Sequence, residues 1–389
     1  MNFDEIIDRR GTHSVKWDMM QTLYGVSPDD GLAMWVADMD FRPPTAVQQA
    51  LETAVSHGVY GYFGDDRAYR EAIIWWMKTR HGWDIRPEWI STTHGLVNGI
   101  SLCIQAFTGP GDGIVLTTPV YHAFARQIRA AGRTVVECQL ANRGGRHEMD
   151  FDAWDGRMTG RETMMVLCSP HNPGGRVWTR EELQGVARFC IRHNLILISD
   201  EIHHDLLMPG QTHIPMTSFP EIADRLIMTT ATTKTFNIAG AHIGNVIIAD
   251  EGLRRRFETQ NALVGNSPNL FGMLMATAAY SPEGSAWVDE LTVYLAENAR
   301  IFDEGLNSIP GVKSMKLEAT YLAWVDFSAL GMDEVEVKRR IEREAKIAVN
   351  YGPTFGAGGE GFMRFNIATP RARISDAVSR LQEAFRDLQ

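Results

Sequence analysis

The sequence lacks any uninterrupted apolar run of the roughly 18 residues that a membrane-spanning helix needs. Its charged start, MNFDEIIDRR, has no apolar signal core, so we expect a cytoplasmic protein that does not engage membranes. The four cysteines are far apart and form no CxxC, which excludes a zinc ribbon or disulfide scaffold and predicts buried thiols. Positive charge is scarce too: 38 basic against 48 acidic side chains give a net charge of −10, a poor balance for a nucleic-acid binder.

What the chain does have is enough length and apolar content for large cores. Its 389 residues are 44% hydrophobic and 22% charged, which indicates two or three globular domains. Short apolar runs alternate with amphipathic helices, and most runs are continuous rather than alternating, as expected of strands covered on both faces. The predicted strands are residues 114–118, 134–140, 163–168, 195–199, 225–229 and 245–249. This order predicts an α/β domain with a parallel sheet between helices.

The pattern changes near residue 285. A long helix is predicted over about 286–306, followed by strands at 321–326, 347–350 and 362–368 and a final helix at about 374–388. We therefore expect an N-terminal arm over 1–45 that wraps onto the body, a large α/β domain over 46–285 and a small α+β domain over 286–389. Within the large domain, Thr179 and Glu182 fit a capping box that starts a helix.

Polar side chains gather where two predicted strands end. Asn172 lies in the turn Ser169-Pro-His-Asn-Pro-Gly-Gly-Arg176, which is either a ligand site beyond a strand end or a plain turn. Asp200, Glu201 and His203 follow the next strand. These three are compatible with a metal site, with an Asp that pairs with a protonated cofactor nitrogen, or with a solvated strand end; metal spacings such as HExxH are missing.

A single lysine, Lys234, follows a further strand and is surrounded by threonines. With no acid beside it in sequence, partial burial would lower its pKa and make it a nucleophile, and the nearby hydroxyls and amides could hold a phosphate. The alternative is an exposed loop lysine.

The string Gly356-Ala-Gly-Gly-Glu-Gly361 matches GxGxxG, but a strand follows it, so we reject a dinucleotide site. Arg364 lies on that strand and is either a two-pronged carboxylate ligand or part of a structural ion pair. Two weaker signals are the glycines of Thr93-His-Gly-Leu-Val-Asn-Gly99, which open a helix as a phosphate site can, and Tyr121, placed to stack on a planar ring.

Together these strings resemble the pyridoxal-phosphate (PLP) enzymes of fold type I, the class I/II aminotransferase superfamily. Within it, the sequence is similar to the MalY/PatB-type cystathionine β-lyases, or C–S lyases, over essentially its whole length. The strings that carry the resemblance are Met34-Trp-Val-Ala-Asp-Met-Asp-Phe41, Ser169-Pro-His-Asn-Pro-Gly-Gly-Arg-Val-Trp178, Ser199-Asp-Glu-Ile-His203, Lys234-Thr-Phe-Asn-Ile-Ala-Gly240 and Arg364-Phe-Asn-Ile-Ala-Thr-Pro-Arg371.

The resemblance implies a mainly parallel seven-stranded sheet, a homodimer with sites at the interface, and no metal. It implies catalytic roles for Lys234, which carries the cofactor, for Asp200, which pairs with the ring nitrogen, and for Tyr121, which stacks on the ring. The implied cofactor-binding residues are Lys234, Asp200, Asn172, His203, Tyr121, Gly95, Leu96, Thr233 and Tyr60, the last reaching the neighbouring subunit's phosphate with Tyr62 as an alternative. The implied substrate-binding residues are Arg364, Asn172 and Ala37.

The implied reaction is cleavage of L-cystathionine or a related S-substituted L-cysteine to a thiol, pyruvate and ammonia. The alternatives are a class I/II aminotransferase, which would use the same lysine, and a mainly regulatory protein that acts through a partner. The chain departs from many superfamily members at Ala231, where serine is common, and at His242, where a phosphate-binding arginine is common.

Overall fold

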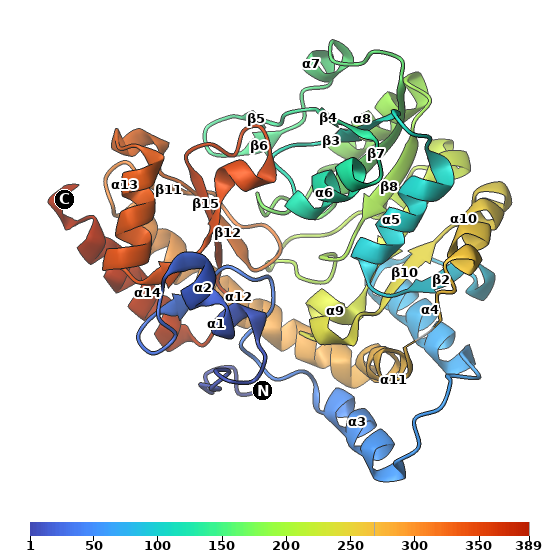
Figure 1. Ribbon diagram of the computed structural model, residues 1–389, viewed down its shortest axis with the longest axis horizontal. Helices are drawn as coiled ribbons and strands as arrows, with labels where there is room; N and C mark the ends of the chain where they lie inside the picture. Colours follow the sequence, from blue (N-terminus) through green and yellow to red (C-terminus); the bar gives the residue numbers. More distant parts are fainter. Residues whose placement is uncertain (268, 389) are drawn as a thin grey trace.

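The computed structural model describes residues 1–267 and 269–388, and its centre is a seven-stranded sheet (Figure 1). In spatial order the strands are β2 (Ile90–Thr93), β10 (Gly244–Ile247), β9 (Leu226–Thr230), β8 (Ile196–Asp200), β7 (Glu162–Cys168), β3 (Gly113–Leu116) and β4 (Thr134–Glu137). The pairs from β4 to β9 are parallel, and β10 runs antiparallel to both of its neighbours. The predicted mainly parallel sheet is confirmed; β2, the seventh strand, was not among the strands predicted from residue patterns.

Strand β7 shows why its sequence is apolar throughout. Met164 and Val166 join one buried cluster, whereas Met165 and Leu167 join another. The first cluster is completed by α5 (Leu96–Phe107), α6 (His122–Ala130) and α10 (Glu251–Leu263), and the second by α4 (Arg67–His81) and α8 (Arg180–Arg192). Helices therefore cover both faces, and each buried Met or Leu side chain contributes about 2 kcal/mol of hydrophobic stabilisation.

A second, antiparallel sheet contains β11 (Lys313–Ser314), β12 (Leu322–Asp326), β15 (Phe362–Asn366) and β14 (Asn350–Tyr351). Helices α12 (Pro282–Asn307) and α14 (Arg371–Ala384) pack together beside it. Both helices begin earlier than predicted, because Ser281 caps α12 ahead of a proline at its first position, and Pro370 immediately precedes α14.

The predicted strand at 347–350 is divided in two. Its first half is β13 (Ile347–Ala348), which pairs in parallel with β1 (Leu32–Ala33) of the N-terminal arm, whereas β14 joins the second sheet. The arm, which also contains α1 (Val15–Asp18) and α2 (Met20–Tyr24), is thereby attached beside the second sheet (Figure 1).

The capping box predicted for α8 is confirmed: Thr179 accepts from the Glu182 amide, and the Glu182 carboxylate accepts from the Thr179 amide. The remaining elements are α3 (Thr45–His57), β5 (Ala141–Asn142), β6 (His147–Glu148), α7 (Phe151–Asp155), α9 (Thr232–Thr235), α11 (Leu270–Ala279) and α13 (Glu334–Arg339). No helix among the described residues is both long and apolar enough to cross a membrane.

Candidate active site

Three neighbouring strands deliver polar residues to one edge of the large sheet. Asn172 follows β7, Asp200 ends β8, and Lys234 lies in α9, directly after β9. Because β7, β8 and β9 are parallel neighbours, their carboxyl ends meet. A cavity of about 180 Å³ opens there. Nine of the residues singled out in the sequence line it: Ala37, Gly95, Leu96, Tyr121, Asn172, Asp200, His203, Thr233 and Lys234.

Asp200 is a buried carboxylate with few partners. It accepts a hydrogen bond from the Ile202 amide at 3.3 Å and lies 3.5 Å from the Thr229 hydroxyl. Burial raises its pKa to about 7. A carboxylate in this setting is suited to a ligand that brings a positively charged N–H group, because such a partner restores the ionised form.

Lys234 is partly buried, and desolvation lowers its pKa to about 8. Its ammonium group donates to the Ala37 carbonyl at 2.7 Å, which brings the N-terminal arm to the lysine. With this pKa the amine is mostly protonated at pH 7, but about a tenth of it is neutral there, far more than for an ordinary lysine, and this fraction can act as a nucleophile or base.

Arg364 lies on β15 of the second sheet but reaches across to the first. Its guanidinium, on a residue only 3% exposed, donates to Asn172 Oδ1 at 3.0 Å, to the Trp35 carbonyl at 2.9 Å and to Asn350 Oδ1 at 2.5 Å. Its Nε is buried and has no hydrogen-bond partner among residues 1–267 and 269–388. A buried N–H group left without a partner is costly, so the arginine is prepared to accept an anionic ligand beside Asn172.

His203 and the start of α5 complete the cavity wall. Burial lowers the pKa of His203 to about 3, so the ring is neutral, and its Nδ1 has no partner in the described part of the chain. Gly95, at φ +79°, forms the N-cap of α5, and a β-carbon added there would meet open space. The first-turn amides of this helix and the Thr233 hydroxyl suit an anion such as phosphate.

Tyr60, Tyr62 and Glu201, all named from the sequence, lie away from this cavity. Tyr60 and Tyr62 are 54% and 99% exposed on the segment between α3 and α4, at the lower right of Figure 1, and the contact of Tyr60 with a neighbouring subunit stays a prediction. The metal alternative on Asp200, Glu201 and His203 fails, because Glu201 turns away from the cavity. Its carboxylate is buried against the Ser199 hydroxyl, the Met216 amide and His213.

Residue patterns missed three groups at the site. Asp38 and the Tyr321 hydroxyl flank the Ala37 carbonyl, and Asn350 contacts Arg364. Asp38 carries a signal in retrospect: it is one of two carboxylates in the otherwise apolar string 34–41. Nothing local distinguishes Tyr321 or Asn350 from ordinary strand residues, since their partners lie far away in sequence.

Comparison with known proteins places this geometry in context. Residues 33–381 match the family model for aminotransferase class I and II. The chain is 40% identical to cystathionine β-lyase PatB of Bacillus subtilis, over 99% of this chain and 100% of that protein. Cystalysin of Treponema denticola, whose crystal structure contains pyridoxal 5′-phosphate, superposes with a TM-score of 0.95 at 35% identity, covering 100% of this chain and 99% of that one. The PLP-bound C–S lyase of Staphylococcus hominis gives a TM-score of 0.91 at 32% identity, covering 99% and 98%.

Proposed function

Since the chain belongs to the class I and II aminotransferase family, we propose that it is a PLP-dependent C–S β-lyase. Its substrate is L-cystathionine or a related S-substituted L-cysteine, and its products are a thiol, pyruvate and ammonia. The observation that carries the proposal is the placement of Lys234 and Asp200 on the wall of one cavity, with Arg364 anchored beside it through Asn172.

The cavity fits the cofactor on its own chemistry. Asp200, which is buried and has few hydrogen-bond donors around it, would hold a protonated pyridine nitrogen. His203 Nδ1, which has no partner among the described residues, and Asn172 would lie near the polar substituents of the ring. Gly95, Leu96 and Thr233 would hold the phosphate at the start of α5. Tyr121, which also lines the cavity, would stack on the ring.

Bound there, pyridoxal 5′-phosphate supplies a conjugated ring that accepts the electron pair left when a proton leaves the substrate's Cα. The protein's residues do the rest. Arg364 binds and orients the α-carboxylate. The Lys234 amine takes the Cα proton as general base, becomes an ammonium and then gives a proton to the departing sulfur. Water completes the reaction, so that substrate plus water yields thiol, pyruvate and ammonia without oxidation or reduction.

We also propose a cytoplasmic homodimer with the cavity completed by the second subunit. The four cysteines are free and buried, as in reducing compartments. Exposed apolar side chains lie beside Tyr60: its neighbours Val59 and Tyr62 are 68% and 99% exposed, and Phe271, whose ring centroid is 5.4 Å from that of Tyr60, is 36% exposed. Mixing two inactive variants, Tyr60→Ala and Lys234→Ala, should restore part of the activity if each site uses both subunits; no recovery in confirmed hybrid dimers contradicts a shared site.

The function itself is tested by incubating the PLP-loaded protein with L-cystathionine and no keto acid. We expect pyruvate and free thiol in equal amounts over repeated turnovers. Turnover that begins only when a keto acid is added would instead identify an aminotransferase. Absence of both reactions from a loaded enzyme would refute the proposed substrate class.

A further inference from the structure

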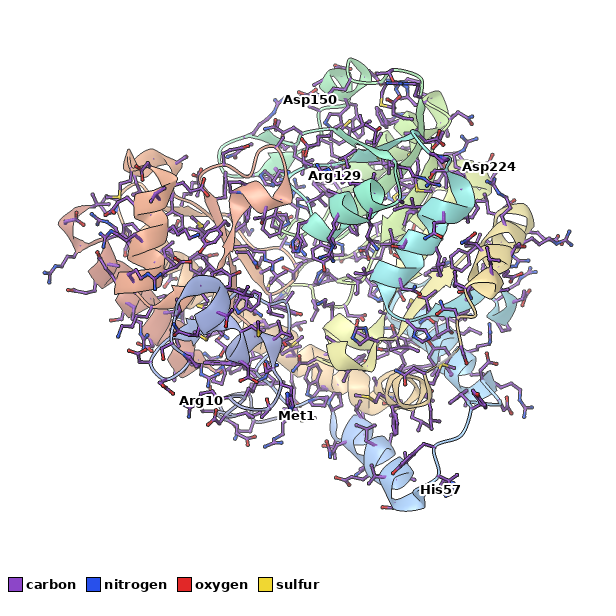
Figure 2. All side chains as sticks on the ribbon, viewed as in Figure 1. Met1, Arg10, His57, Arg129, Asp150 and Asp224 are labelled. Carbon is purple, nitrogen blue, oxygen red and sulfur yellow. The ribbon has the colours of Figure 1, made fainter. Side chains whose placement is uncertain are left out.

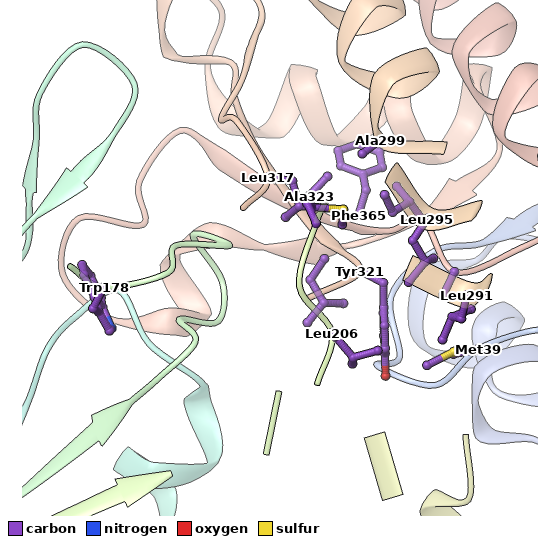
Figure 3. Packing of buried hydrophobic residues seen from close by; sticks show 14 of the residues in the cluster. Met39, Trp178, Leu206, Leu291, Leu295, Ala299, Leu317, Tyr321, Ala323 and Phe365 are labelled. Carbon is purple, nitrogen blue, oxygen red and sulfur yellow. The ribbon is translucent and has the colours of Figure 1, made fainter. Parts of the chain in front are cut away.

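The segment of the arm that carries Ala37 is fixed from several directions. The Asn366 amide donates to the carbonyls of Val36 and Asp38, both at 2.5 Å, and Asn237 bonds both the amide and the carbonyl of Met39. The Met39 side chain packs in the same core cluster as Tyr321 and Leu291 (Figure 3). Ala37 therefore presents its carbonyl to Lys234 from a rigid frame rather than from a loose terminus.

Two carboxylates in this segment are held by cations from elsewhere in the chain. Arg9 donates to both oxygens of Asp38, at 2.8 and 2.9 Å, and to Asp40 at 2.9 Å. Lys16, whose side chain is fully buried, lies 3.2 Å from Asp40 and 3.7 Å from Asp38, and Arg373 lies 3.3 Å from Asp40. Such a network is expensive to bury, and it persists because each charge has a partner.

The two carboxylates differ in what they can affect. Asp40 is 1% exposed, and its negative charge is compensated within the network. Its partners are Lys16, Arg9, Arg373 and the Trp17 indole. Asp38 directly follows Ala37, and its negative charge favours the protonated form of Lys234. The other charged groups that face Lys234 are Arg364, which opposes its protonation, and Asp200, which favours it more weakly than Asp38 does.

We propose that Asp38 is a positioning residue for the Lys234 proton shuttle. Held in place by Arg9 and Lys16, it provides the counter-charge for the ammonium that forms when Lys234 takes the Cα proton, while the Ala37 carbonyl accepts that ammonium's hydrogen bond. The N-terminal arm is thereby part of the proton-transfer apparatus rather than a cover over it. This inference rests on the proposed lyase function, in which Lys234 is the base.

The test measures the pH at which Lys234 loses its proton. The cofactor is removed, and the rate of Lys234 labelling by an amine-reactive reagent is measured by mass spectrometry across pH. Asp38→Asn should lower the midpoint by about half to one pH unit, since an opposite charge at close range shifts a pKa by about 1–3 units and Arg9 already neutralises part of it. Arg9→Gln should raise the midpoint, because it leaves the Asp38 charge less compensated.

The opposite signs separate this role from a structural one, since both substitutions loosen the arm. Arg10→Ala is the matched control: Arg10, labelled in Figure 2, lies on the same arm, is exposed and, among the described residues, forms ion pairs with Asp8 and Asp29 alone, so the midpoint should not move. In the PLP-loaded enzyme, the acidic limb of the kcat profile should move in the same directions.

A folded Asp38→Asn protein with an unchanged or higher midpoint overturns the proposal, as do shifts of the same sign in both variants. If Asp38→Asn does not fold, Arg9→Gln alone decides through its upward shift. The outcome is independent of the lyase assignment, because labelling of Lys234 needs no substrate; absence of pyruvate from the wild-type enzyme would contradict the function and leave the labelling result readable.

Discussion

Replacing Arg364 tests the substrate orientation most directly. The guanidinium is buried and holds Asn172 and Asn350, and its Nε has no partner within the described part of the chain and can take a ligand. A hydrogen bond to a charged group contributes about 1.5–3 kcal/mol, so losing two of them to the substrate carboxylate, at about 1.5–2 kcal/mol each, removes about 3–4 kcal/mol. At 1.36 kcal/mol per tenfold, this corresponds to a decrease in kcat/KM on the order of 10²- to 10³-fold for Arg364→Ala.

The assay is the initial rate of pyruvate release over a range of L-cystathionine concentrations, with cofactor loading checked by absorbance. Most of the loss should fall on KM, because the carboxylate is bound in both the ground and transition states. Arg364→Lys keeps the charge without the planar fork and should lie between wild type and Arg364→Ala. Arg126→Ala controls for a general loss of positive charge. The Arg126 charge lowers the pKa of neighbouring Tyr121 and His122, but the residue does not line the Lys234 cavity.

The reasoning is refuted if a folded Arg364→Ala enzyme keeps its KM. Because the substitution leaves Asn172 and Asn350 without a donor, its thermal midpoint must be measured alongside. A fall in kcat with unchanged KM would move Arg364 from substrate binding to the support of Asn172.

Three further predictions use other parts of the site. Lys234→Ala should abolish turnover while the far-UV circular dichroism stays unchanged, because the ammonium makes one hydrogen bond within residues 1–267 and 269–388, to Ala37; residual activity near the wild-type level contradicts the base assignment. Asp200→Asn should weaken cofactor binding but stabilise the cofactor-free protein at pH 8. The folded pKa of Asp200 is raised from 3.8 to about 7, so the native state holds more protons and loses stability as pH rises through that window, by up to about 4 kcal/mol; urea unfolding of both cofactor-free proteins at pH 4 and pH 8 should show the difference only at pH 8. Gly95→Ala should lower PLP affinity in equilibrium dialysis and cost about 1 kcal/mol of stability, because an alanine at φ +79° is strained even though its methyl group has space; an unchanged dissociation constant would remove the start of α5 from the phosphate site.

Much of the fold could be predicted because the main signals are local. The continuous apolar runs of β7 and β8 require cover on both faces, and their polar ends must then meet at one edge of the sheet. Strand β2 was not predicted because Ile90-Ser-Thr-Thr93 is short and mostly polar, and its place in the sheet depends on pairing with β10, more than 150 residues away. Helix α12 begins before its predicted start near residue 286, although Ser281 and Pro282 form a recognisable helix start.

The residues of the site likewise differ in whether a local sequence signal predicts them. Lys234, Asp200 and Asn172 are marked by their position after strands, so the sequence alone brings them together. The network around Asp38 is not marked, because Arg9, Lys16, Asn366 and Arg373 become neighbours only through the tertiary fold. The predicted contact of Tyr60 cannot form within a single chain, because the phosphate site that it would reach lies on another copy.

The fixed segment around Ala37 also has a consequence for biosynthesis. Its carbonyl neighbours are held by Asn366, and Arg364, the proposed carboxylate ligand, is bonded to Trp35, so contacts at the site span more than 320 residues of sequence. At a translation rate of about 5–20 residues per second, roughly 15 to 65 seconds separate the synthesis of the two sides. The large sheet can assemble during that interval, but the arm cannot make its contacts with Asn366 and Arg364 until β15 has left the ribosome. The nascent chain therefore holds its lysine, strand ends and helix start well before it can close the site, and final closure of the active centre is a late, long-range folding event.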